Sequence, residues 1–224
     1  MAGDNDQVII IEPVIETSDA TGFTAWPVSA RPGPEDLVLS GELAPTDIGM
    51  VIGVIAVYNH DHITPPGEED DHPAPAWLIQ RITQADSLIA PGGLRVRDTS
   101  TGLIVSPGCC CGLEHWQEWN QAAVGQSPWL GHSPAPWVEH LGHIIRVWPD
   151  GGDEAVPPAG ALPIEIPASD LPRLIASAHQ QLQGFLDLLE PWALPLAGSN
   201  AGSLGPALAT HFRVNWPAPP TARS

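Results

Sequence analysis

Residues 169–189 carry the pattern that most constrains this fold, because their apolar side chains share one face of a helix. Seven apolar residues recur at helical spacing, namely Leu171, Leu174, Ile175, Ala178, Leu182, Phe185 and Leu189. Ser169 or Asp170 can cap the start of this helix, and Pro191 is expected to close it. A helix with a continuous apolar stripe needs a core to pack against. We therefore expect it to pack on a sheet that includes residues 143–148 and 162–166.

Short runs of β-branched residues between Pro, Gly and Asp clusters predict the strands of that sheet. The predicted strands are residues 8–11, 37–39, 50–58, 94–97, 103–105, 143–148, 162–166 and 212–216. The unbroken Val and Ile character of 50–58 indicates a strand that is buried on both faces. Residues 94–97 and 103–105 flank a five-residue loop and are typical of a β-hairpin.

Three more segments predict helices, and together with the strands they define the fold class. A helix is expected after Pro73 and Pro75, and Pro91 is expected to end it. Another helix is expected after the cysteines, with Leu113 and Trp116 on one face, and a short one at 204–211. Residues 125–142 show no clean period and are expected to form an ordered loop. The sequence therefore predicts an α+β fold, a single domain with a mixed or antiparallel sheet packed by two to four helices. It would span residues 1–216, with 1–72 as an alternative β-rich sub-domain and 217–224 as a frayed Pro-rich tail.

The charge of the chain excludes some classes of partner. Its 224 residues include 26 acidic side chains and only 8 basic ones, all arginine, so the formal net charge is −18. Phosphate binding relies on Lys and Arg, which argues against nucleic acid, and the same charge disfavours anionic membrane surfaces. Residues 1–7 are acidic where a secretory signal would be basic, and the longest apolar run, 48–58, is shorter than the roughly 20 residues of a membrane span. We expect a cytoplasmic protein.

Cys109, Cys110 and Cys111 are consecutive and are the only cysteines in the chain. This odd, consecutive set fits a reducing compartment. Three interpretations stand. One thiol at a helix start is reactive, although His115 is badly placed as its base. Alternatively, two of the thiols, Cys109 and Cys111, bind a divalent metal such as zinc, because adjacent cysteines point apart. The interpretation that we favour is that all three are small, buried, reduced side chains at a tight turn.

Histidines and carboxylates form a second candidate cluster. His60 and His62 would share one face if they ended a strand, and an acidic loop follows them. With His72 they could bind zinc, nickel or manganese, but a solvated acidic loop is the simpler interpretation. The carboxylates of this loop nearest to His72 are Glu68, Glu69, Asp70 and Asp71. A looser group of His132, His140 and His143 is interpreted as exposed histidines within aromatic packing.

The nine tryptophans favour core packing, with a recognition surface as the alternative. Trp116 and Trp119 lie three residues apart on a predicted helix, so they share one of its sides. If one of them is exposed, a binding surface would combine these rings with the acidic residues 68–71.

Nothing in the sequence selects an enzyme class. No Gly-rich nucleotide-binding loop and no G-x-S-x-G motif occurs, so we lean against catalysis and expect no cofactor. Residues 107–119, PGCCCGLEHWQEW, resemble a segment of small bacterial proteins from GC-rich genomes to which no function is assigned; this implies a family and no activity. Two hypotheses result. The chain is a non-catalytic cytoplasmic binding protein, similar in general character to immunity proteins that inhibit a basic protein partner. The alternative is a metal- or thiol-dependent enzyme centred on residues 109–111 or on His60 and His62.

Overall fold

The computed structural model describes residues 8–20, 22–30, 36–64, 73–151, 156–157 and 159–215. The chain divides into two compact units, and both are built from segments that are distant in sequence. The first comprises Met1–Glu16, Asp36–Leu39 and Ala90–Gln181, and the second comprises Thr17–Glu35, Ser40–Ile89 and Leu182–Ser224.

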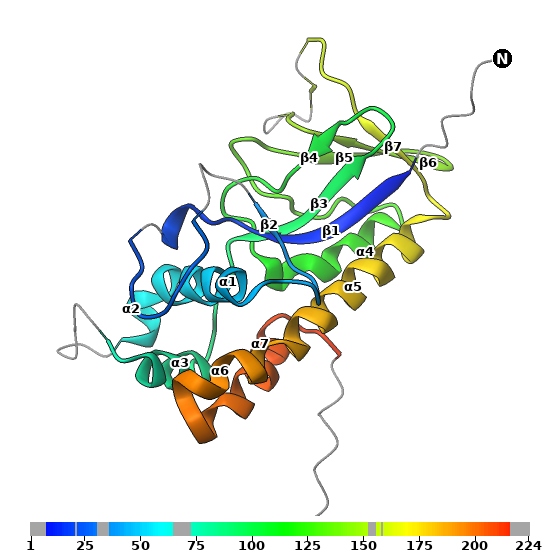
Figure 1. Cartoon of the computed structure of the whole chain (residues 1–224). Helices are drawn as coiled ribbons and strands as arrows, with labels where there is room; N and C mark the ends of the chain where they lie inside the picture. Colours follow the sequence, from blue (N-terminus) through cyan, green and yellow to red (C-terminus); the bar gives the residue numbers. More distant parts are fainter. Residues whose placement is uncertain are drawn as a thin grey trace, which may run out of the picture. The chain divides into compact units, whose positions relative to one another are not determined.

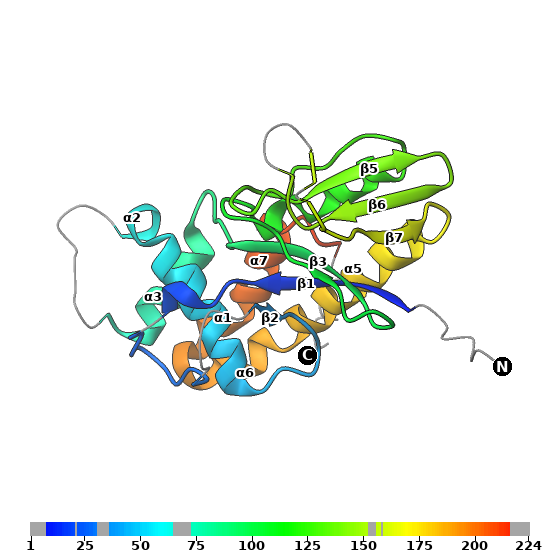
Figure 2. The ribbon, with the colours of Figure 1, turned by 90° about the horizontal axis from the view of Figure 1, so that it is seen from above.

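The first unit contains two antiparallel sheets, which confirms the predicted α+β class. One sheet has the strand order β2-β1-β3-β4 and the other has the order β5-β6-β7 (Figures 1 and 2). The strands are β1 (Ile9–Ile15), β2 (Leu37–Val38), β3 (Gly92–Asp98), β4 (Ile104–Val105), β5 (Trp137–Leu141), β6 (Ile144–Trp148) and β7 (Ile164–Pro167). The predicted hairpin is present as β3 and β4. Residues 137–141, which were expected to be loop, form β5.

A buried ion pair helps to fix the register between β1 and β3. Glu12 is opposite Arg95 in this register, and its carboxylate is almost fully buried. Arg95 donates from Nε and Nη2 to Glu12 Oε1 at 3.0 and 2.7 Å. Because a buried charge without a partner is strongly destabilising, a shifted register would break this pair and be disfavoured.

The second unit is helical. Its helices are α1 (Pro45–Tyr58), α2 (His60–Ile63), α3 (Pro75–Gln84), the end of α5 (Leu171–Asp187), α6 (Leu189–Ala197) and α7 (Leu204–His211), with 3-10 turns η1 (Ser18–Ala20) and η3 (Gly198–Ser203). Figure 1 shows α3, α6 and α7 side by side, and contacts among all three join them. Helices α3 and α7 occur where they were predicted, although α3 ends at Gln84. The first unit adds η2 (Leu113–Glu118) and α4 (Trp119–Ala122) after the cysteines.

The prediction of a strand at 50–58 is wrong, because these residues belong to α1. Burial explains the error: all residues of α1 from Ile48 to Ala56 are buried, so the sequence shows no polar face and no helical period. Gly49 and Gly53 lie one turn apart and allow close packing, since a Cβ at Gly49 would overlap the carbonyl oxygen of Pro27.

Asn59 ends α1 and is completely buried. Its Nδ2 donates to the carbonyl oxygens of Ile55 and Ile89 at 2.8 and 2.7 Å, and its Oδ1 accepts from the Ile89 amide at 2.9 Å. One side chain therefore satisfies the end of the helix and both backbone polar groups of Ile89.

The apolar stripe of the helix predicted at 169–189 is confirmed, since all seven of its residues are buried. Pro191 does not close the helix. Instead α5 ends at Asp187, and α6 begins at Leu189 with Pro191 in its first turn, where the missing N–H is tolerated. Residues 212–215 form no strand, and Trp216 and the predicted tail lie outside the described residues. Within the described residues, no helix combines the length and hydropathy needed to cross a membrane.

Candidate metal centre

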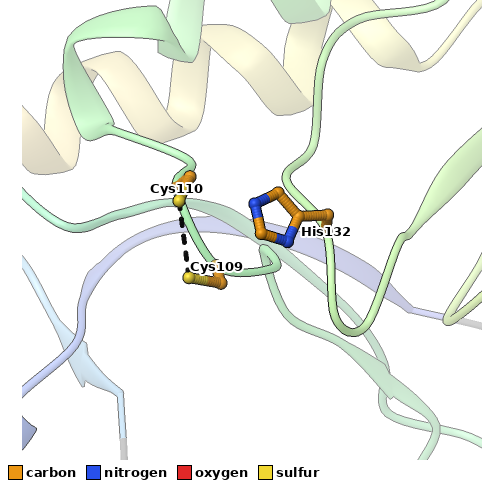
Figure 3. A group of neighbouring side chains, drawn as sticks. All are labelled: Cys109, Cys110 and His132. Atoms are coloured by element: carbon orange, nitrogen blue, oxygen red, sulfur yellow. Dashed lines mark hydrogen bonds between the residues drawn. The ribbon is translucent and has the colours of Figure 1, made fainter.

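Cys109, Cys110 and His132 come together on the surface of the first unit. Figure 3 shows the two sulfur atoms next to each other, with the imidazole beside them on a separate segment. One ligand atom from each residue lies within 4.8 Å of the other two, and all three side chains are exposed. Among the residues that the structure describes, this is the group of Cys, His, Asp or Glu side chains that is compact enough to hold a metal ion.

Backbone pairing places Cys109 beside His132, although 23 positions separate them. The two residues form an isolated antiparallel bridge, in which each amide donates to the carbonyl of the other, at 2.8 and 3.0 Å. Side chains of directly paired residues lie on the same face of an antiparallel ladder. This pairing therefore brings a thiol and an imidazole to one surface.

Glycines at both ends of this bridge allow the two segments to approach. A Cβ at Gly108 would overlap the carbonyl oxygen of Pro134, and a Cβ at Gly131 would overlap that of Gly108. Gly131 also has a φ of 93°, a conformation that favours glycine. Both glycines are therefore required by the fold of the site.

A turn brings the second sulfur to the same side. The Cys111 amide donates to the Gly108 carbonyl at 3.3 Å, so Cys109 and Cys110 occupy the central positions of a β-turn. Cys110 has a φ of 61°, which interrupts the strand-like alternation of neighbouring side chains. As a result the Sγ atoms of Cys109 and Cys110 are 3.5 Å apart. This left-handed conformation is strained for a residue other than glycine, and such strain is concentrated at functional sites.

The three thiols differ in their chemistry. Cys111 is buried and is not part of the compact group, and its Sγ lies 4.0 Å from the Trp129 carbonyl oxygen. Burial, aided by the neighbouring Glu114, raises the pKa of the Cys111 thiol to about 12. The hydrogen bond with Cys110, followed by the charge of that thiol, raises the pKa of Cys109. Cys111 is therefore inert, while Cys109 and Cys110 are exposed and in contact with each other.

The two sulfurs that converge are not the pair that was expected. Cys109 and Cys111 were expected to form the metal-binding pair, because adjacent side chains were assumed to point apart. The positive φ of Cys110 makes the adjacent pair converge instead. The expectation that all three cysteines are buried is wrong for Cys109 and Cys110, which are exposed and free. The residues that were missed are Cys110 and His132, of which His132 had been assigned to a loose aromatic cluster.

The predicted histidine cluster does not form among the described residues. His60 and His62 lie on the short helix α2, not at the end of a strand, and residues two apart on a helix point in different directions. The His60 ring instead lies 3.3 Å from the Thr64 hydroxyl. His72 and the acidic residues Glu68, Glu69, Asp70 and Asp71 lie outside the described residues.

Trp116 and Trp119 do not form an exposed recognition surface. They are only 6% and 2% exposed, and the Trp116 ring stacks on the His179 ring at 5.3 Å between centroids. They share a buried side of η2 and α4, which is the core-packing interpretation. Trp129 is 53% exposed and its ring centroid lies 6.3 Å from that of His132, beside the group of Cys109, Cys110 and His132.

The second unit carries an apolar groove with a volume of about 570 Å³. Its lining includes Trp26, Pro27, Pro45, Trp192 and Pro195. The Trp26 indole N–H donates to the Gly49 carbonyl at 2.8 Å, so it is used within the protein. No ionisable side chain lines the groove among the described residues. It therefore offers an apolar surface without groups for acid–base or metal chemistry.

Comparisons of the chain with protein-family models, with curated proteins and with solved structures found no match.

Proposed function

We propose that this protein reversibly binds a thiophilic transition-metal ion, such as zinc, through Cys109, Cys110 and His132. The observation that carries the proposal is the convergence of two thiols and one imidazole within 4.8 Å. Thiolate and imidazole are the ligands that zinc and other soft or borderline metals prefer in proteins.

The distance between the sulfurs supports this assignment. Tetrahedral zinc, at about 2.3 Å from sulfur and about 2.0 Å from nitrogen, holds two sulfurs about 3.8 Å apart and a sulfur and a nitrogen about 3.5 Å apart. The sulfurs of Cys109 and Cys110 are 3.5 Å apart before any ion binds. Small side-chain rotations are therefore enough to complete the site.

Three protein ligands with exposed side chains favour an exchangeable ion over a structural one. Structural zinc sites are closed by four protein ligands, whereas a site with three keeps a position for water or for another molecule. The three side chains here are exposed, so that position faces solvent. Binding and release, not structural support, is the function we assign to the site. Free thiols also suit a reducing compartment, and we place the protein in the cytoplasm.

Metal titration of the reduced protein tests the proposal. Cobalt(II) serves as a spectroscopic probe, because thiolate ligation gives it an intense absorption in the near ultraviolet. We expect one ion per chain and expect zinc to displace it. Cys109→Ser, Cys110→Ser and His132→Ala should each weaken binding by more than about tenfold, since even the loss of an outer-shell partner can have that effect.

Cys111→Ala is the matched control, because this third thiol is buried and is not part of the group. It should retain one ion per chain with affinity close to that of the wild type. Binding that is unchanged in Cys109→Ser, or lost equally in Cys111→Ala while circular dichroism shows both variants folded, would contradict the proposal.

A second candidate function is supported by the net charge of −18. We propose as the alternative that the chain is a non-catalytic, immunity-like protein that binds a basic protein partner by electrostatic steering. The test is the association rate with a basic protein recovered by pull-down, measured against salt. Changing Glu68, Glu69, Asp70 and Asp71 to Gln or Asn should slow association and flatten its salt dependence. An unchanged rate and salt slope would exclude these residues.

A further inference from the structure

We infer that Cys109 and Cys110 form a reversible disulfide on oxidation by hydrogen peroxide, and that closing this bond releases the metal ion. The inference rests on the proposed function and adds its regulation. The observation behind it is that the two sulfurs that would hold the ion are also each other's nearest reaction partners, 3.5 Å apart on an exposed turn.

The positions of the three sulfur atoms determine which two cysteines form the disulfide. Closing the bond requires the sulfurs to approach to about 2.05 Å, a movement of about 1.5 Å. Both side chains are exposed, so rotation about their side-chain bonds meets no packed core. Cys111 is buried and its sulfur faces the carbonyl oxygen of Trp129. The third thiol is therefore outside the reach of both the oxidant and the pair.

The covalent geometry makes such a bond labile. The Cα atoms of adjacent residues joined by a trans peptide are about 3.8 Å apart, closer than the roughly 4.4–6.8 Å of ordinary disulfides. A disulfide between neighbours is consequently strained, and strained, exposed disulfides are easily reduced. These properties belong to a switch and not to a structural cross-link.

Hydrogen peroxide oxidises the two thiols to a disulfide in two steps. The thiolate sulfur of one cysteine attacks a peroxide oxygen, the O–O bond breaks and hydroxide leaves, so that this cysteine becomes a sulfenic acid. The neighbouring sulfur then attacks the sulfenic sulfur, the S–S bond forms and the S–O bond breaks with loss of a second hydroxide. Two thiols and one peroxide yield one disulfide and two waters. Sulfur is oxidised and the peroxide oxygens are reduced.

Disulfide formation between Cys109 and Cys110 and metal binding by the same two thiols exclude each other. The thiolate electron pairs that would bind the ion are committed to the disulfide, so His132 remains as the sole ligand of the group. One imidazole from an exposed loop does not retain a zinc ion against water. The zinc form should therefore react with peroxide to give the disulfide, free zinc and two hydroxides.

Intact-mass analysis of metal-free, reduced protein tests the first step. After treatment with equimolar peroxide and alkylation in denaturant, we expect the wild type to lose two hydrogen atoms and to accept one alkyl group instead of three. A dithiol reductant should restore three. Cys111→Ala, the matched control, should form the same disulfide and accept no alkyl group. Cys109→Ser and Cys110→Ser should form no intramolecular disulfide.

Zinc release tests the second step. Zinc-loaded protein is treated with peroxide in the presence of a coloured chelator, and released zinc should equal disulfide formed. Three alkyl groups after oxidation, or a disulfide that persists in Cys109→Ser, would overturn the inference. If zinc-loaded protein forms the disulfide but keeps its zinc, the proposed link between disulfide formation and zinc release is overturned. A disulfide in protein that binds no metal at all would refute the proposed function and leave the disulfide standing.

Discussion

Replacing Asn59 tests whether its buried amide organises the second unit. Asn59→Ala removes three hydrogen bonds, to Ile55 O, Ile89 O and Ile89 N. Each hydrogen bond contributes about 1 kcal/mol, and the polar groups of Ile89 that keep no partner add to the loss. The free energy of unfolding should therefore fall by about 3 kcal/mol.

Asn59→Asp tests the same hydrogen bonds through the pH dependence of the free energy of unfolding. The introduced carboxyl keeps an acceptor for the Ile89 amide but turns an oxygen toward two carbonyl oxygens. Only the protonated form can donate to one of them, so its pKa in the folded protein is raised above the unfolded value. The variant is therefore least destabilised at acid pH. Its stability relative to the wild type falls as pH rises, toward the loss of about 3–5 kcal/mol expected for an unpaired buried charge.

Urea unfolding followed by tryptophan fluorescence, at about pH 5 and about pH 8, measures both effects. Asn120→Ala is the control, because Asn120 is exposed and makes one hydrogen bond to the Gln117 carbonyl; it should change stability by less than about 0.5 kcal/mol. A loss below about 1 kcal/mol for Asn59→Ala would refute the reasoning. So would an Asp variant whose deficit does not depend on pH.

Two further predictions concern the core and the thiols. Leu182→Ala should destabilise the protein by about 2–5 kcal/mol, because Leu182 is fully buried, whereas Leu194→Ala at a 58% exposed position should have an effect below about 0.5 kcal/mol; equal midpoints in urea would contradict the assigned burial. A thiol reagent should label Cys109 and Cys110 in the native, reduced protein and reach Cys111 only after unfolding, because only the last is buried. Mass spectrometry counts the labels, and three on the native chain would show that Cys111 is accessible.

Helices with one polar face could be predicted from the sequence, whereas a helix that is buried on all sides could not. Helix α5 has one buried face and one face with exposed positions, so its apolar stripe was visible in the sequence. Helix α1 is buried along most of its length, which hides the period and leaves its β-branched residues to favour a strand. The signals that could have identified it are Pro45 at the start and the i, i+4 pair of Gly49 and Gly53.

The group of Cys109, Cys110 and His132 could be predicted only in part, because it depends on backbone geometry that residue types do not encode. The cysteines were visible, but the pairing assumed regular alternation, which the positive φ of Cys110 removes. His132 joins through a bridge to Cys109 across 23 positions. Gly108 and Gly131, which permit that approach, were the available signal.

The central position of β1 has a consequence for the synthesis of the chain. Strand β1 pairs with β3 through partners such as Glu12 and Arg95, which are 83 positions apart. At about 5–20 residues per second, a ribosome needs several seconds to deliver β3 after β1 has emerged. During that interval β2 can pair only with Val14 and Ile15, so the edge of the Ile-rich β1 that faces β3 stays open and Glu12 lacks its Arg95 partner. Nascent chains should consequently depend on chaperones until about residue 98 has left the exit tunnel, and truncations that end before β3 should aggregate.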